Sequence, residues 1–316
     1  MQSIPCEYCQ SGGLLIMASQ DIIRISGTTD ITPASQARIG AVQQVTKLFD
    51  ATKCTGCKAC QVACSEWNDL REDVGTFQGS YQNPMTLSPE SWNIMQYHEV
   101  MDNNKLRWQF THTACMHCAD PACLKACSTS GAIVQHANGT VDFDSNKCIG
   151  CGYCASACPF NVPKISAKDN KAYKCTLCSD RLAVGLEPSC VKTCTVGALR
   201  FGTREDMLFY AEKRVEQLKE RGFSKAGLYN PEGVGGTHMM MILHDITQPE
   251  SYGMPKDPQI PAATEWRQDW LKPLGTAGLL ATAAFALMHR IAVGRNIVEE
   301  DQPGYIDAGV KEEEKL

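Results

Sequence analysis

The sequence lacks an excess of positive charge. Among its 316 residues, 35 acidic side chains outnumber 30 basic ones, and the net charge is −5. Nucleic acids require a basic protein face, so this charge argues against a nucleic-acid-binding protein. The glycines Gly233, Gly235 and Gly236 also lack the spacing and the preceding strand of a dinucleotide-binding loop, and they do not predict such a site.

The start of the sequence lacks the pattern of a secretory signal peptide. The apolar run Leu14–Ala18 is too short for the centre of such a signal, and Glu7 occupies the region where positive charge is expected. We therefore expect that this chain carries no export signal of its own.

Cysteine, in contrast, is abundant, with 18 residues. Disulfide frameworks are typical of short secreted domains, and a chain of this length does not fit that class. Sixteen of the cysteines form four runs along the sequence. Run one is Cys54, Cys57, Cys60 and Cys64; run two is Cys115, Cys118, Cys123 and Cys127; run three is Cys148, Cys151, Cys154 and Cys158; run four is Cys175, Cys178, Cys190 and Cys194.

The spacing within the runs indicates iron–sulfur chemistry. Runs one and three have the pattern C-x2-C-x2-C-x3-C, and run three ends in Cys158-Pro159. A short loop of this kind supplies three thiolates to one [4Fe-4S] cluster, and the fourth cysteine binds the other cluster of a two-cluster ferredoxin. Structural zinc sites usually join two separated C-x2-C pairs instead. Iron–sulfur clusters are therefore favoured over zinc.

Internal repeats indicate which runs lie together. Between runs two and three the sequence predicts a hairpin, with strands Ala132–Gln135 and Thr140–Phe143 around an Asn138-Gly139 turn. These two runs then form a compact inner module. The segment LFDATKCTGC at run one resembles DFDSNKCIGC at run three, and GALRFG after run four resembles GAIVQH after run two. We expect runs one and four to form an outer module that encloses the inner one.

This nested pairing predicts four ligand sets. Set 1 is Cys54, Cys57, Cys60 and Cys194; set 2 is Cys64, Cys175, Cys178 and Cys190; set 3 is Cys115, Cys118, Cys123 and Cys158; set 4 is Cys127, Cys148, Cys151 and Cys154. The alternative is a sequential pairing of run one with run two, but no hairpin is predicted in the long segment between them. Nesting is favoured although chain neighbours usually pair.

Four clusters in one chain predict an electron-transfer protein. Iron bound by four thiolates has no open coordination position, so we expect one-electron transfer and no catalytic residue. Lysines close to the ligands would favour the reduced, more negative clusters, although each one alone is more simply a solvated surface residue. These lysines are Lys53, Lys58, Lys125, Lys147, Lys174 and Lys192.

Four segments carry a resemblance to a known family. CTGCKACQVACSEWND, CIGCGYCASACPFNVP, YKCTLCSDR and YNPEGVGGTH resemble the iron–sulfur (β) subunits of membrane-bound respiratory formate dehydrogenases, and the resemblance covers about residues 17 to 300. Ser128 and Thr195 stand where proline commonly follows the last cysteine of a run, which changes a turn and not the ligands. Four-cluster subunits of other molybdenum oxidoreductases and of some hydrogenases share the cysteine runs and remain an alternative.

The resemblance implies a fold, cofactors and partners. The fold class is α+β, with two ferredoxin-like two-cluster modules in nested arrangement and a C-terminal transmembrane helix, and the cofactors are four [4Fe-4S] clusters. A catalytic α subunit with molybdenum or tungsten and two pterin cofactors would oxidise formate, and a cytochrome b γ subunit would pass the electrons to quinone. The resemblance further implies a heterotrimer with a periplasmic globular part, exported folded on the twin-arginine signal of the partner.

The sequence near the C-terminus predicts a membrane anchor. Pro273–Met288 contains no charged residue, and its extension to Val293 gives about the 20 residues that a spanning helix needs. Trp266 and Trp270 precede this stretch, where an interfacial anchor is expected. We therefore expect one transmembrane helix in contact with membrane lipid, although the flanking basic residues do not decide its orientation. A zinc-stabilised interaction protein on a membrane tether remains the alternative from another class.

Two further elements and two unassigned cysteines complete the prediction. Thr203 to Gly222 predicts a helix that covers a module, and Met239–Leu243 predicts a buried strand. Cys6 and Cys9 belong to no run, and only weak candidates exist to complete a metal site with them. These candidates are His98 and His112.

The predicted organisation follows from these elements. It consists of an N-terminal extension and partner-contacting segment at 1–47, an outer module at 48–114 and 170–202, an inner module at 115–169, a covering helix with an extended segment at 203–265, a membrane helix at 266–294 and a disordered tail at 295–316.

Overall fold

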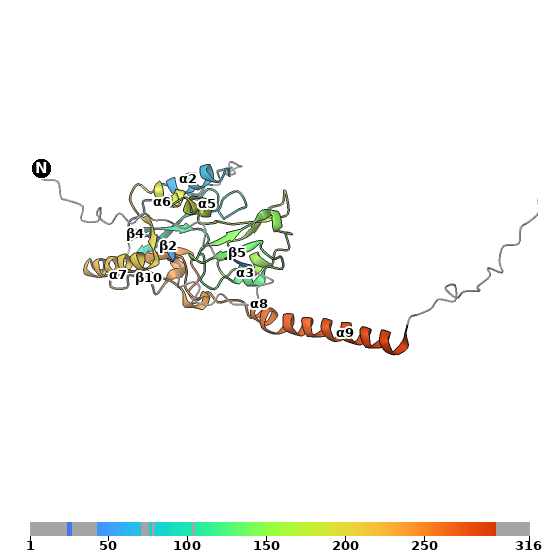
Figure 1. Cartoon of the computed structure of the whole chain (residues 1–316). Coiled ribbons are helices and arrows are strands. Elements are labelled where there is room, and N and C mark those ends of the chain that lie inside the picture. Colours follow the sequence, from blue (N-terminus) through green and yellow to red (C-terminus); the bar gives the residue numbers. More distant parts are fainter. Residues whose placement is uncertain (1–23, 27–42, 71–75, 78, 103–104, 295–316) are drawn as a thin grey trace, which may run out of the picture. The chain divides into compact units, whose positions relative to one another are not determined.

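A computed structural model of the protein describes residues 24–26, 43–70, 76–77, 79–102 and 105–294 (Figure 1). The chain divides into two compact units, Met1–Thr264 and Glu265–Leu316, and each is described by itself. The predicted tail and the two cysteines that belong to no run lie outside the described residues.

A four-stranded sheet lies at the centre of the first unit. β2 pairs antiparallel with β9, from Val45 opposite Thr203 to Phe49 opposite Leu199. This is the pairing that the sequence repeat predicts for the outer module, because β2 precedes run one and β9 follows run four. β11, the predicted buried strand, pairs parallel with β2, and every residue of both strands is buried. The order in the sheet is β10 (Gly227–Tyr229), β11 (Met239–Leu243), β2 (Val45–Asp50) and β9 (Leu199–Thr203).

The predicted covering helix, α7 (Arg204–Glu220), packs against one face of this sheet. Its first turn is capped by Thr203, whose hydroxyl accepts a hydrogen bond from a backbone amide of that turn. Leu48 of β2 packs into the apolar side of the helix. Next to it, Arg214 Nε donates to Asp50 Oδ2 at 2.8 Å, and both side chains are buried. Removing one partner of such a buried pair leaves an uncompensated charge, so the pair holds α7 in register with β2.

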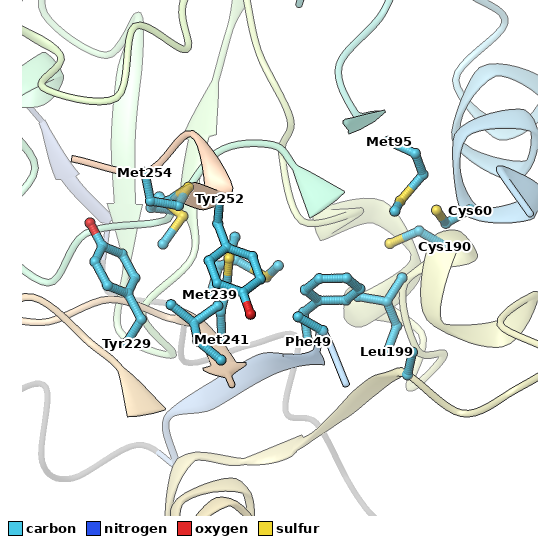
Figure 2. Packing of buried hydrophobic residues seen from close by; sticks show 14 of the residues in the cluster. Phe49, Cys60, Met95, Cys190, Leu199, Tyr229, Met239, Met241, Tyr252 and Met254 are labelled. Atoms are coloured by element: carbon cyan, nitrogen blue, oxygen red, sulfur yellow. The ribbon is translucent and has the colours of Figure 1, made fainter. Parts of the chain in front are cut away.

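The opposite face of the sheet packs against the cysteine loops. Phe49 of β2 and Met239 and Met241 of β11 belong to one apolar cluster with Cys60 and Cys190. Figure 2 shows the sulfur atoms of Cys60 and Cys190 turned toward the same space beside this cluster. The sheet therefore separates a helical layer from a sulfur-rich layer.

The inner module contains the predicted hairpin. β5 (Ile133–His136) and β6 (Val141–Phe143) pair antiparallel, which agrees with the predicted strands to within one residue at each end. β1 (Arg24–Ser26) adds to the outer side of β5. Gly139 in the turn has φ +92°, a conformation that favours glycine.

Short helices carry or adjoin the cysteine runs. A helix of run one packs against a helix of run four, α2 against α6, and a helix of run two packs against a helix of run three, α3 against α4. The short helices are α2 (Ala59–Trp67), α3 (Ala122–Ala126), α4 (Tyr153–Ala157), α5 (Ser179–Ala183) and α6 (Ser189–Lys192). The remaining short elements of this unit are β7 (Lys164–Ile165), β8 (Ala172–Tyr173), and the 3-10 turns η2 (Ser145–Lys147), η3 (Glu232–Val234) and η4 (Pro249–Tyr252).

A long hairpin occupies the segment between runs one and two, where none was predicted. β3 (Ile94–Asp102) pairs antiparallel with β4 (Lys105–Thr113) in a two-stranded sheet of their own. The expectation that this segment lacks a hairpin is therefore wrong. Charged residues interrupt its apolar pattern, and cross-strand aromatic contacts hold it together instead, such as Tyr97 opposite Phe110 with ring centroids 5.4 Å apart.

The second unit contains the predicted membrane helix. α8 (Ala262–Trp266) leads through a π-helical turn, η5 (Arg267–Leu271), into α9 (Lys272–Val293). α9 has 22 residues, which corresponds to a length of about 33 Å. By length and composition it is the one described helix that qualifies as a membrane span. Its length agrees with the predicted span, and both preceding tryptophans are exposed.

The hairpin turn of the inner module provides a test of the fold. A Cβ atom on Gly139 would lie 2.0 Å from Cε1 of His238, a buried side chain whose Nδ1 lies 2.7 Å from the carbonyl oxygen of Val45. We expect Gly139→Ala to lower the free energy of unfolding by about 1–3 kcal/mol more than a change at an open glycine. Urea titration of the protein, followed by circular dichroism, measures this difference.

Gly222→Ala is the matched control for this prediction. Gly222 also has a positive φ, +96°, but nothing lies within 4 Å of its would-be Cβ. Equal urea midpoints for the two alanine variants would contradict the packing of His238 against the hairpin.

Candidate metal centres

All sixteen cysteines of the four runs have free thiols. Most are buried or half-buried, and only Cys57 of set 1 and Cys151 of set 4 are exposed. A disulfide framework is therefore not formed by these residues. Buried thiols without a disulfide are well placed to hold a metal group that excludes water.

Each run begins with the same backbone arrangement around its first cysteine. The amide nitrogens of Gly56, Gly150 and Leu177 lie 3.4 Å from the sulfur atom two residues earlier, and all three donors have a left-handed conformation. His117 repeats the arrangement at Cys115. An N–H group directed at sulfur stabilises a thiolate, which is the ligand form of cysteine.

The cysteines of set 4 line a hollow of about 300 Å³, including the part open to solvent. Its remaining walls are largely apolar, with Ile133, Phe143 and Ile165 among them. Four cysteines that line one otherwise apolar hollow fit a [4Fe-4S] cluster, which needs four thiolates and no other ligand. The four cysteines that share this hollow are Cys127, Cys148, Cys151 and Cys154.

Ser128 contributes to this centre in a way that the sequence did not indicate. Its hydroxyl lies 3.4 Å from the Sγ atom of Cys151. Slight burial works in the other direction, but the contact with Ser128 and nearby backbone amides lower the pKa of Cys151. The residue that replaces the common proline therefore contacts a predicted ligand.

Cysteines of sets 1 and 2 that are distant in sequence influence one another. Burial, together with the nearby Cys194 and Cys57, raises the pKa of the Cys54 thiol to about 11. In set 2, burial raises the pKa of Cys64 well above its usual value. The further contributions to Cys64 come from Cys175, Cys190 and Cys178.

In sets 3 and 4, too, cysteines that are distant in sequence raise one another's pKa. Burial raises the pKa of Cys118 well above its usual value, and the thiols that add to this effect are Cys115, Cys123 and Cys158. Burial raises the pKa of Cys154 to about 12, and the thiols that add to it are Cys127, Cys148 and Cys151. In each case the neighbours come from both runs of one predicted module.

Neighbouring sets also approach one another in a definite order. Cys190 of set 2 adds to the raised pKa of Cys60 in set 1. Cys175 of set 2 adds to that of Cys115 in set 3, and Cys154 of set 4 adds to that of Cys123 in set 3. These contributions are secondary to burial in all three thiols. Through these thiols, predicted set 1 neighbours set 2, set 2 neighbours set 3, and set 3 neighbours set 4.

A zinc ion and a cubane cluster require different arrangements of thiolates. A zinc site holds each sulfur about 2.3 Å from one ion, and no three cysteine, histidine or carboxylate side chains converge in this way within the described part of the chain. Each iron of a cubane cluster takes a different thiolate, so the four ligands of a cluster lie farther apart than those of one zinc ion.

The two histidines considered for a further metal site lie in the β3–β4 hairpin. His98 is on β3, and His112 is on β4 with its ring centroid 5.9 Å from that of Phe49. Cys6 and Cys9 lie outside the described residues and stay unassigned.

The structure separates the lysines near the runs into two kinds. Lys125 and Lys147 pair with surface carboxylates at 2.6 and 3.3 Å, as solvated lysines do. Lys174, in contrast, is only 3% exposed. Lys47 is 1% exposed and was missed, because it lies seven positions before the nearest cysteine. The one available signal was a lysine inside the otherwise apolar strand segment VTKLF.

Fold and site together define a class of protein. Paired strands that bring two cysteine runs together are the architecture of a two-cluster ferredoxin. Residues 53–132 and 106–204 each match a family model of a 4Fe-4S dicluster domain, and these overlapping ranges do not follow the bounds of the nested modules. Residues 261–303 match a model described as the transmembrane part of formate dehydrogenase N. Two dicluster domains imply four [4Fe-4S] clusters and an electron-transfer role.

Comparison with characterised proteins identifies the family. The chain is 54% identical over 288 residues to the iron–sulfur subunit of the nitrate-inducible formate dehydrogenase of Escherichia coli, which covers 91% of this chain and 98% of that protein. It is 53% identical to the formate dehydrogenase iron–sulfur subunit of Haemophilus influenzae, over 90% and 91% of the two chains. The thiosulfate reductase electron transfer subunit of Salmonella typhi is 34% identical, over 60% of this chain. The chain belongs to the family of formate dehydrogenase iron–sulfur subunits, which transfer electrons and are not themselves catalytic.

Metal analysis tests the nature of the centres. Four cubane clusters correspond to ~16 iron atoms per chain, so we expect anaerobically purified protein to contain this amount of iron, an equal amount of acid-labile sulfide and negligible zinc. Elemental analysis and a sulfide assay measure these values. Stoichiometric zinc without sulfide would contradict the iron–sulfur assignment.

Proposed function

We propose that this chain carries electrons from a molybdenum or tungsten formate dehydrogenase subunit to a membrane cytochrome b and quinone, through four clusters held by the nested sets 1 to 4. Each cluster supplies one-electron transfer. The cysteines bind the clusters, the apolar core excludes water from them, and backbone amides stabilise the thiolates. This chain would form a heterotrimer with the catalytic subunit and the cytochrome.

The pairing of β2 with β9 is the observation that carries the nested arrangement. It brings the segment before Cys54 beside the segment after Cys194, although the inner module lies between them in the sequence. The packing of α2 on α6 and of α3 on α4 supports the same arrangement. Sequential pairing would require run one to lie beside run two, and the hairpin of β3 and β4 forms no ladder with the strands of either module.

The order of the sets supports a path with two ends. Electrostatic contributions between thiols link set 1 to set 2, set 2 to set 3, and set 3 to set 4, which supports a linear path. The exposed cysteines, Cys57 and Cys151, belong to the first and last sets of this line. Electron transfer to a partner requires a short distance, so we assign these two ends to the contacts with the catalytic subunit and with the cytochrome.

The membrane helix and the domain division belong to the same proposal. We propose that α9 anchors the chain in the inner membrane, with the globular part on the periplasmic side and the tail in the cytoplasm. The parts are the outer module at 48–114 and 170–202, the inner module at 115–169, the covering segment at 203–265, the membrane helix at 266–294, and the terminal segments 1–47 and 295–316. Membrane suitability of α9 and the match at 261–303 support the anchor.

Formate dependence tests the role of the chain. We expect the complex, purified in detergent, to reduce its clusters within the dead time of manual mixing when formate is added, as measured by bleaching of the visible absorbance. Hydrogen and thiosulfate, supplied to matched samples, are the controls for other catalytic partners. Reduction by dithionite but not by formate would contradict the formate partner and leave the electron-transfer role intact.

Cysteine replacement tests the nested sets. In the nested arrangement, Cys60→Ser and Cys194→Ser alter the same electron paramagnetic resonance signal, because both residues bind one cluster. Cys127→Ser alters a different signal. In the sequential arrangement Cys60→Ser would instead share its signal with a run-two variant such as Cys127→Ser. Spectra of the dithionite-reduced complex at low temperature distinguish the two arrangements.

A further inference from the structure

Lys47 lies in the interior of the first unit without a carboxylate partner. It is 1% exposed on β2, and its Nζ atom lies 4.0 Å from Sγ of Cys190. Within the described ranges, no ion pair to an acidic side chain is formed by this ammonium group. A buried ammonium group is costly unless negative charge surrounds it.

The negative charge around Lys47 is that of set 2. The groups that act electrostatically on its ammonium group are four thiols, Cys190, Cys175, Cys178 and Cys64, which are all members of set 2. Lys47 therefore faces one complete ligand set.

Lys174 occupies a corresponding place beside set 3. It is 3% exposed, and its Nζ atom donates to the carbonyl oxygens of Val141 and Cys175. The groups that act electrostatically on its ammonium group are Cys115 and Cys123 of set 3, the carboxylate of Asp142, and Cys175 of set 2. Its side chain is therefore a second buried cation, located between sets 2 and 3.

The internal repeat shows that both modules have a lysine ammonium group near the same strand position. In one module the lysine lies in the strand, and in the other it comes from another segment. When LFDATKC is aligned with DFDSNKC, Lys47 in β2 corresponds to Val141 in β6. In the inner module this position has no ammonium group of its own, and the ammonium group of Lys174 binds the Val141 carbonyl instead. Two independent residues thus supply the same charge beside sets 2 and 3.

The end sets differ from the middle sets. The main contributions to the pKa shifts of Cys127, Cys151 and Cys154 in set 4 come from burial, from other thiols and from hydrogen bonds, and the lysines buried among the described residues are Lys47 and Lys174. In set 1, Asp50 acts on Cys54, with a sign opposite to that of a cation, although Lys47 also reaches Cys60. The buried positive charge is therefore concentrated at the middle of the line.

We propose that Lys47 and Lys174 are fixed interior cations that raise the reduction potentials of the two middle clusters above those of the two end clusters. Reduction adds one negative charge to a cluster, and a nearby buried cation stabilises that charge. Electrons arriving at either end would then collect in the interior, where the protein excludes water. The inference rests on the proposed ligand sets. Both lysines act through their positive charge and bind no metal.

Neutral replacements of each lysine test this proposal. We expect Lys47→Met and Lys47→Gln to lower the potential of the set 2 cluster, and Lys174→Met and Lys174→Gln to lower that of the set 3 cluster. The expected size is at least a tenfold change in the reduction equilibrium, which is about 59 mV for a one-electron couple. Redox titration of the intact complex, followed by electron paramagnetic resonance, measures each potential. Cys190→Ser and Cys123→Ser identify the two signals.

Lys192→Met is the matched control. Lys192 is exposed and lies two residues from Cys190 and two from Cys194, so solvent screens its charge despite its closeness in sequence. We expect its replacement to leave all four potentials unchanged. Equal shifts in the Lys192 and Lys47 variants would overturn the assignment of the effect to burial.

The iron content of each variant shows whether the tuning role or the ligand sets are wrong. Normal iron with unchanged potentials in the Lys47 and Lys174 variants would overturn the proposal and leave the proposed ligand sets standing. Loss of iron from both replacements at one lysine, with normal iron in the Lys192 variant, would show that this lysine is a structural counterion and would also overturn the tuning role. Signals that do not follow Cys190→Ser or Cys123→Ser would contradict the ligand sets themselves.

Discussion

Thiolate coordination of iron is the interaction on which the rest of this structure depends. A loop of three closely spaced cysteines can supply three corners of a cubane cluster, and the fourth thiolate must come from another segment. A module therefore needs two cysteine runs side by side. The pairing of β2 with β9 brings the chain after the fourth run back to the segment before the first, as the proposed outer module requires.

The same coordination chemistry determines the composition of the core. Thiolates and clusters carry negative charge, which is costly to bury without compensation. Backbone amides directed at sulfur, such as that of Gly56 at Cys54, compensate part of it. Buried ammonium groups, above all that of Lys47, compensate another part. Buried positive charge is thus a property of the interior, and the net charge of −5 does not show it.

Local patterns predicted much of the fold because they act over short distances. The Asn138-Gly139 turn, the capped helix after Thr203 and the buried strand Met239–Leu243 agree with the structure to within one or two residues. The β3–β4 hairpin was missed because its strands are stabilised by cross-strand aromatic pairs such as Tyr97 and Phe110. A partner across a ladder is not visible in the periodicity of either strand alone.

The sequence by itself determined the metal chemistry, the family and the membrane helix, since cysteine spacing, family segments and the length of an uncharged run are properties of the chain. Only the tertiary structure decided which side chains surround the sulfur atoms. Lys47 and Lys192 show how closeness in sequence differs from closeness in space. Lys192 is close to two ligands in sequence but exposed, whereas Lys47 is distant from run four and yet 4.0 Å from Cys190. Electrostatic influence depends on distance and burial in space, and sequence separation measures neither.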